Sequence, residues 1–193
     1  MGRESGFIAA AATIASGEVN FCLVPEEPLE LEGENGFLAK LDRRLDARNH
    51  AVVVVAEGVG QDLIEGLDPE AEDKSGNRRL GDIGVVLKQR LTEHFAGIDK
   101  PIGMKYFDPS YYIRSVAANA ADSLLTERFA RHAAHAAIAG KTDLFVGFWN
   151  GRIVHVPLSA SVGKKRHMEP DSELWSAVLA ITGQNGSRQA GKS

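Results

Sequence analysis

The sequence contains a single cysteine, Cys22, among its 193 residues. One thiol forms no internal disulfide, and it excludes zinc and iron–sulfur sites that need several cysteines. Because unpaired thiols are typical of reducing compartments, we expect the protein in the cytoplasm. Long apolar runs are also missing: the most apolar stretches, 7–12 and 51–56, are far shorter than the roughly 20 residues of a membrane-spanning helix. The first residues lack the pattern of a signal peptide, so we expect no membrane association.

The sequence has fewer basic than acidic residues. Lys and Arg together number 22 against 26 Asp and Glu, which gives a formal net charge of −4. The chain therefore has no overall basic field to attract nucleic acid, and we expect no nucleic-acid partner. An anionic ligand would need a local cluster of Arg and Lys. The remaining composition, 44% hydrophobic and 25% charged, is that of an ordinary globular protein.

Strand-like and helix-like segments alternate along the chain. This order predicts an α/β fold, with a mainly parallel sheet and helices on both faces in a Rossmann-like three-layer arrangement. An Asn150-Gly151 turn adds an antiparallel edge hairpin. We expect one domain over 1–182 and a disordered tail at 183–193. The expected helices are 5–16 (capped by Ser5), 37–48, 82–95, 122–139 and 171–181; the expected strands are 20–24, 51–55, 144–148 and 153–156; and 65–79 is expected to be a polar loop.

Ligands of parallel sheets bind beyond the carboxyl ends of the strands. Glu57 follows the 52–55 strand in a glycine-rich turn, where a carboxylate can accept hydrogen bonds from sugar hydroxyls; an ordinary solvated turn is the alternative. The segment 105–114 combines Lys105, Tyr111 and Arg114, which suits a phosphate, although a surface loop is equally consistent with the spacing. Arg3 precedes the first helix and can hold an anion at its N-terminus, unless it is simply solvated.

Three other patterns are weaker. Residues 186–193 match the G-x-x-x-x-G-K-S pattern of a phosphate-binding loop, but no buried strand precedes them, so we interpret the match as chance. His132 and His135 lie three apart on a predicted helix without a third ligand, which favours an interface or surface role over a metal site. The basic run 164–167 stands alone in an acidic chain and is interpreted as a solvated loop.

Five groups of motifs, in order over about residues 1–157, resemble the 6-phosphofructokinase family. The residues of these motifs most resemble the branch of the family shared by plant, trypanosomatid and many bacterial enzymes. The motifs are Met1-Gly2-Arg3-Glu4-Ser5-Gly6-Phe7; Val24-Pro25-Glu26; Ala56-Glu57-Gly58; 108–116 (DPSYYIRSV) with Asn119-Ala120; and 136–143 (AAIAGKTD) with 146–152 (VGFWNGR).

The resemblance implies a site for fructose 6-phosphate. It places the Met1-Gly2-Arg3 motif at the substrate, with Arg3 as the catalytic residue that stabilises charge on the transferred phosphoryl group near the 1-hydroxyl. By the same resemblance Glu57 binds sugar hydroxyls. The 6-phosphate is bound by Tyr111 and Arg114, with Lys105 reaching it from a neighbouring subunit. A homo-oligomer is therefore expected.

The same resemblance implies motifs that these residues do not contain. Family enzymes carry a Gly-rich loop for the phosphoryl donor and magnesium, and an Asp-containing motif that supplies the catalytic base. We therefore expect an N-terminal half to be missing, no cofactor-binding or metal-binding residue in this chain, and no activity of the chain alone. The full enzyme is expected to use Mg²⁺ and ATP in glycolysis. A pyrophosphate-dependent enzyme and a non-catalytic sugar-phosphate-binding or regulatory subunit remain alternatives.

Overall fold

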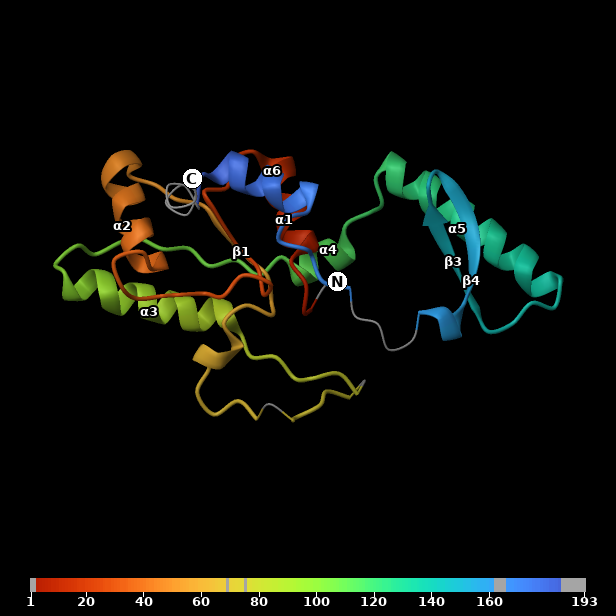
Figure 1. Cartoon of the computed structure of the whole chain (residues 1–193), viewed down its shortest axis with the longest axis horizontal. Coiled ribbons are helices and arrows are strands. Elements are labelled where there is room, and N and C mark those ends of the chain that lie inside the picture. The colour runs from red at the N-terminus through yellow and green to blue at the C-terminus, as the bar shows by residue number, and fades with distance from the viewer. Residues whose placement is uncertain (1–2, 69, 75, 162–165, 185–193) are drawn as a thin grey trace. The chain divides into compact units, whose positions relative to one another are not determined.

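The computed structural model describes residues 3–68, 70–74, 76–161 and 166–184. The chain divides into two compact units, a larger unit of Met1–Phe107 with Arg166–Ser193 and a smaller unit of Asp108–Lys165 (Figure 1). The predicted domain, 1–182, includes residues of both, and its role in binding a sugar phosphate stays a prediction. Met1, Gly2 and most of the predicted tail lie outside the described residues.

The larger unit is built on a parallel pair of strands. Strand β1 pairs with β2 so that Phe21 lies opposite Val53. The predicted helices and strands are present, with ends shifted by a few residues, and this confirms the α/β class. The elements are α1 Phe7–Ser16, β1 Phe21–Leu23, α2 Phe37–Arg48, β2 Val53–Val55, the 3₁₀ turn η1 Gln61–Leu63, α3 Ile83–Gly97 and α6 Glu173–Thr182.

Helices cover both faces of this pair, as the three-layer expectation requires. Because side chains alternate across a strand, neighbouring residues of β1 enter different cores. Cys22 packs with Ala10 of α1 and Trp175 of α6. Phe21 packs on the other side with helices α2 and α3, whose buried residues there are Phe37, Leu38, Leu41, Leu91 and Phe95.

The first helix begins in a way that its sequence does not reveal. Its N-cap is Gly6, which makes no side-chain cap, so the prediction of Ser5 as the cap is wrong. Glu26 takes that role from a distance, because both of its carboxylate oxygens accept the Gly6 N–H at 3.0 Å. Oε1 of Glu26 also accepts the N–H of Met168 at 2.9 Å. Glu26, three residues beyond the end of β1, thus joins the start of α1 to the segment that leads to α6.

Cys22 is a core residue. It is 1% exposed, and burial raises the pKa of its thiol, although a hydrogen bond with Thr13 acts in the opposite direction. A buried thiol with a raised pKa is protonated near neutral pH and is not a nucleophile. The single cysteine therefore contributes packing rather than chemistry.

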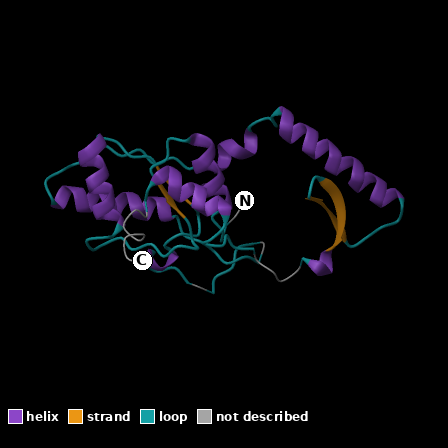
Figure 2. Cartoon of the chain, turned by 45° about the horizontal axis from the view of Figure 1, so that its top comes forward, coloured by secondary structure: helices purple, strands orange, loops and turns teal. Residues whose placement is uncertain are grey.

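The smaller unit is a helix-and-hairpin unit, with a long helix beside a two-stranded ribbon (Figure 2). Asn150 and Gly151 have φ of 48° and 76°, the left-handed conformations that a tight two-residue hairpin needs. Among the residues described, this hairpin is a separate sheet rather than an edge of the β1–β2 pair. The elements are α4 Ser110–Ser115, α5 Ala120–Ile138, β3 Leu144–Trp149, β4 Arg152–Pro157 and the 3₁₀ turn η2 Leu158–Ala160.

One face of the hairpin packs on α5. The Arg128 guanidinium lies 5.1 Å from the centre of the Phe148 ring, and the rings of His132 and His155 meet edge to face at 5.8 Å. His132 is therefore an interface residue, whereas His135 is exposed. The interface role favoured for His132 agrees with this packing.

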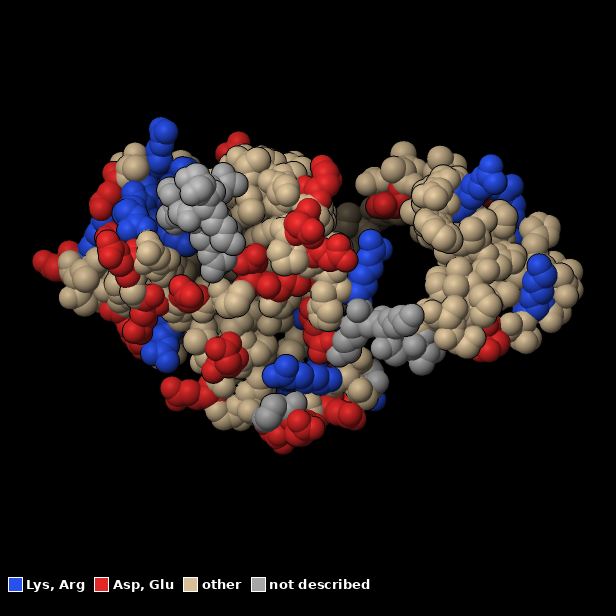
Figure 3. Space-filling view, viewed as in Figure 1, with Lys and Arg blue, Asp and Glu red and all other residues tan. Residues whose placement is uncertain are grey.

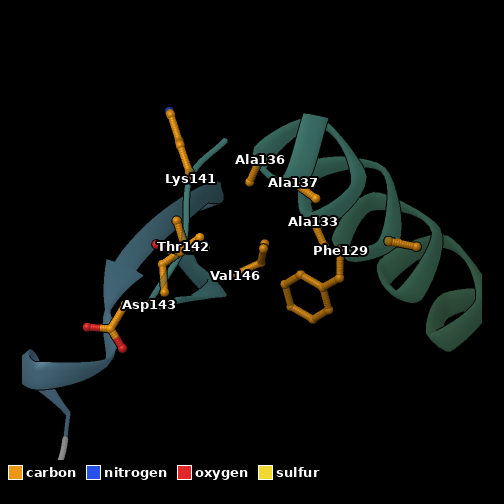
Figure 4. A pocket seen from close by; sticks show the side chains of 10 residues that line it. Phe129, Ala133, Ala136, Ala137, Lys141, Thr142, Asp143 and Val146 are labelled. Carbon is orange, nitrogen blue, oxygen red and sulfur yellow. The ribbon is translucent and has the colours of Figure 1, made fainter. Parts of the chain in front are cut away.

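A groove of about 440 Å³ lies between α5 and β3. The side chains of Phe129 and Val146 lie close together in it, and Lys141 extends away from it (Figure 4). Four alanines of α5 line the helix side, and their small side chains leave the space open. None of the predicted site residues lines this groove.

The surface in view carries both signs of charge. Basic side chains gather over α2, and acidic side chains lie directly beside them (Figure 3). This face therefore shows no continuous basic field. No helix in the described part of the chain combines the length and apolar character needed to cross a membrane.

Candidate functional site

Arg3 is held by the loop that follows η1. Its Nη1 pairs with Oδ2 of Asp73, and its Nη2 donates to the carbonyl of Arg78 at 2.9 Å. The N–H at the start of α1 is bound to Glu26. The structure therefore shows Arg3 with partners in the 71–79 loop rather than as a solvated side chain.

Glu57 is exposed in the turn that follows β2. Its backbone carbonyl accepts the side-chain amide of Gln61 at 2.8 Å, and the same amide donates to the Gly81 carbonyl at 3.2 Å. The Gly81 N–H returns a bond of 2.9 Å to Gln61 Oε1. The buried Gln61 side chain thus holds the backbone of the turn in place, while the Glu57 carboxylate stays accessible to solvent.

Gly58 brings this turn against the Arg3 segment. A Cβ at Gly58 would lie 2.6 Å from the Arg3 carbonyl oxygen, closer than real Cβ atoms come. Only glycine permits this approach of two backbones. The predicted sugar-binding turn and the predicted catalytic arginine are therefore on adjacent segments, although they are 54 positions apart by their numbers in the sequence.

Lys105 lies in an extended segment that is anchored near both ends. Lys100 bonds to Asp42 at 2.6 Å and also to Asp46, and these two carboxylates raise its pKa. At the other end the Tyr106 hydroxyl donates to Asp82 at 2.9 Å.

Between these anchors the side chains alternate between the core side and the solvent side of the segment. Ile102 and Met104 pack on the core beside α2 and α3, whereas Lys105 is exposed. An exposed cation on a fixed segment fits a contact with a ligand or with another subunit.

Helix α4 carries the predicted phosphate-binding pair. Tyr111 and Arg114 are three residues apart in this six-residue helix, so they lie on one face. Both are exposed, and Tyr111 is 82% exposed. Just before the helix, Asp108 accepts bonds from the backbone N–H and the hydroxyl of Ser110, both at 2.9 Å. These bonds, with a smaller contribution from the charge of Arg114, hold the pKa of Asp108 below its ordinary value.

The predicted residues thus fall into two sets, one in each unit. Arg3 and the Glu57 turn are adjacent in the larger unit, which also holds Lys105, and Tyr111 with Arg114 share a face of α4 in the smaller unit. Met1 and Gly2 lie outside the described residues, as do the 186–193 pattern and Lys164 and Lys165 of the basic run. The next residue of that run, Arg166, stacks 5.3 Å from the centre of the Phe7 ring.

Sequence reasoning missed Asp73 and the structural role of Gln61. Asp73 lies in a polar, glycine-containing segment with no periodicity, and its partner is 70 positions away. A single carboxylate in such a loop gives no local signal of its contact. Gln61 follows the glycine-rich turn in sequence, but only the fold shows that its amide joins Glu57 to Gly81.

The chain is similar to known 6-phosphofructokinases. The chain is 44% identical over 190 residues to an ATP-dependent 6-phosphofructokinase of Borreliella burgdorferi, covering 95% of this chain and 42% of that protein. It is 42% identical to a chloroplastic ATP-dependent 6-phosphofructokinase of Arabidopsis thaliana, covering 95% and 34%. A pyrophosphate-dependent phosphofructokinase structure from Marinobacter aquaeolei aligns with a TM-score of 0.63 at 20% identity, covering 94% of this chain and 46% of that one.

The fold is that of an α/β protein with helices on both faces of a parallel pair of strands. The Phosphofructokinase family profile matches residues 1–137, so the chain belongs to the phosphofructokinase family. It spans less than half the length of these two relatives. The likeness to the pyrophosphate-dependent structure, at 20% identity, supports the fold alone.

Proposed function

We propose that this chain supplies the fructose 6-phosphate site of a 6-phosphofructokinase, which transfers a phosphoryl group from ATP to the 1-hydroxyl of the sugar. Relatives named ATP-dependent 6-phosphofructokinase at 38–44% identity support the activity and the donor. The observation that carries the proposal is the approach of Gly58 to the Arg3 backbone. It brings the segment that carries Arg3 against the turn that carries Glu57, which supports a shared role of these two residues in binding a sugar phosphate.

Each proposed role follows from the chemistry of the side chain. The Glu57 carboxylate accepts hydrogen bonds from sugar hydroxyls. Arg114 offers a planar fork of donors to the 6-phosphate, and Tyr111 donates a neutral hydrogen bond on the same helix face. Arg3 stabilises the negative charge that develops on the phosphoryl group, and Lys105 adds a point charge from a neighbouring subunit of a homo-oligomer.

Magnesium is proposed for the full enzyme but not for residues of this chain. Mg²⁺ prefers carboxylate and other oxygen ligands, and no group of three or more His, Cys, Asp or Glu side chains gathers at one point among the residues described. Pyrophosphate stays the alternative donor, and the cytoplasm stays a predicted location.

The purified 193-residue polypeptide is expected to show no phosphofructokinase turnover by itself. The donor loop and the catalytic base motif of the family do not occur among its residues, so phosphoryl transfer lacks both. A coupled assay with fructose 6-phosphate, Mg²⁺ and either ATP or pyrophosphate measures this. Robust magnesium-dependent turnover with either donor would show that the expectation is wrong.

Binding of fructose 6-phosphate is the test of the site itself. Titration of the chain by calorimetry is expected to show binding that Arg114→Ala weakens by about tenfold or more, because a charge-assisted contact to phosphate is lost. Arg131→Ala is the matched control, since Arg131 is an exposed arginine of the same unit paired only at the surface with Glu127.

If the wild-type chain does not bind, or if Arg114→Ala binds as the control does, the assignment of the phosphate site fails. Binding without turnover also fits the non-catalytic subunit, in which case a separate donor-binding partner restores activity.

A further inference from the structure

Asp73 and Arg78 fix the Arg3 guanidinium from one side. Oδ2 of Asp73 accepts a hydrogen bond from Nη1 of Arg3, and the Arg78 carbonyl accepts one from Nη2. A guanidinium has five N–H donors in one plane, so these two bonds set the plane and leave further donors for a ligand. The side chains of Arg3 and Asp73 remain 34% and 27% exposed, so solvent or a ligand still reaches the pair.

The loop orients the Asp73 carboxylate through its own backbone. Oδ1 of Asp73 accepts the N–H of Asn77 at 3.1 Å, which leaves Oδ2 directed at Arg3. The Asp73 N–H donates to the Asn77 carbonyl at 2.7 Å, and the Gly76 N–H donates to the Asp73 carbonyl at 3.0 Å. A further backbone bond of 2.7 Å, from the N–H of Arg79 to Ala71, closes the loop. The carboxylate is thus oriented by contacts that do not involve Arg3.

A fixed arginine binds phosphate better than a mobile one. A free arginine side chain loses conformational freedom when it is ordered, and a preorganised side chain has already lost that freedom before the ligand arrives. The negative charge of Asp73 acts in the opposite direction, since it offsets part of the attraction of Arg3 for an anion. Solvent screens that charge at a partly exposed pair, so we expect the gain in orientation to be the larger effect.

We infer that Asp73 is a positioning residue that presents Arg3 to the phosphoryl group at C1 of the sugar. This inference rests on the proposed function, in which Arg3 faces that group. It assigns the polar loop at 71–79 a part in substrate recognition, through a residue that need not touch the sugar.

Two ligands separate positioning from a general structural role. Fructose 1,6-bisphosphate carries the 1-phosphate that Arg3 faces, and fructose 6-phosphate does not. Asp73→Asn is expected to lower the affinity of the chain for the bisphosphate by about tenfold and that for the monophosphate by less than about threefold. Asp68→Asn, the same change three residues before the loop, is the control, because the Asp68 side chain accepts the Glu70 N–H, a bond that asparagine retains.

The outcomes are distinct. Equal losses for both ligands would mean that Asp73 only maintains the fold, and tighter binding of the bisphosphate would mean that Asp73 competes with the ligand for Arg3. Either result overturns the inference. Loss confined to the bisphosphate supports it.

A ligand-free measurement covers the case in which the wild-type chain binds neither sugar phosphate and the proposed function fails. Amide hydrogen exchange of residues 71–79, followed by mass spectrometry, is expected to rise severalfold in both Arg3→Ala and Asp73→Asn. The double variant should rise no further, because both changes remove the same contact. Additive effects, or unchanged exchange in Arg3→Ala, would show that Asp73 does not hold Arg3.

Discussion

Replacing Trp175 with alanine is expected to lower the free energy of unfolding by about 3–5 kcal/mol, the range typical of deleting a large buried aromatic side chain. Trp175 is 1% exposed and packs where α6 meets α1 and β1. Its indole Nε1 has no hydrogen-bond partner in the described structure, so the loss would come from packing and the cavity left behind. Since small domains are stable by only about 5–15 kcal/mol, this one change should remove a large part of the free energy of unfolding of the larger unit.

Urea unfolding followed by circular dichroism measures the effect of Trp175→Ala, with Trp149→Ala as the matched control. Trp149 ends β3 in the smaller unit and is 70% exposed, so its loss should cost little. Trp175→Phe keeps most of the buried volume and should lie between the two. If Trp175→Ala and Trp149→Ala unfold at the same urea concentration, the position of Trp175 in the core is wrong.

Strong local patterns were sufficient to predict several elements. The leucines at 38, 41 and 45 are spaced for one helical face, and α2 has the predicted bounds, 37–48. The Asn150-Gly151 dipeptide predicted the hairpin, because these residues adopt positive φ more readily than most. In both cases the signal lies within a few neighbouring residues.

The remaining features depend on contacts between distant residues. Helix α4 was not predicted, since it has six residues and none of them is buried, so it has no apolar stripe. The cap of α1 was assigned to Ser5, whereas the acceptor is Glu26, twenty positions away. The contact of Arg3 with Asp73 joins residues 70 positions apart, and Asp73 lies in a loop without periodicity. The motif resemblance named Arg3 and Glu57, but only the backbone approach at Gly58 shows that they are neighbours.

Replacing Glu26 with alanine is expected to lower the free energy of unfolding by about 2–4 kcal/mol. The change leaves the N–H groups of Gly6 and Met168 without their acceptor, and an unsatisfied buried donor costs about 1–3 kcal/mol. Relaxation cannot easily restore these bonds, because a Cβ at Gly6 would lie 2.5 Å from Val24, which shows how tightly the start of α1 packs on the residue that follows β1. Glu18→Ala, an exposed carboxylate just after α1, is the control.

Glu26→Gln separates the shape of the side chain from its acceptors. Oε1 of Glu26 accepts both N–H groups, so a glutamine oxygen in that position can still accept both, while the amide nitrogen in place of Oε2 is a donor and would face the Gly6 N–H. This variant should therefore lose less stability than Glu26→Ala, and amide exchange at Gly6 and Met168 should rise less than in Glu26→Ala. The same carboxylate positions the helix that follows Arg3, so Glu26→Ala should also increase exchange in the 71–79 loop. If Glu26→Ala is as stable as Glu18→Ala, Glu26 does not stabilise the start of α1, and α1 does not couple Glu26 to the proposed site.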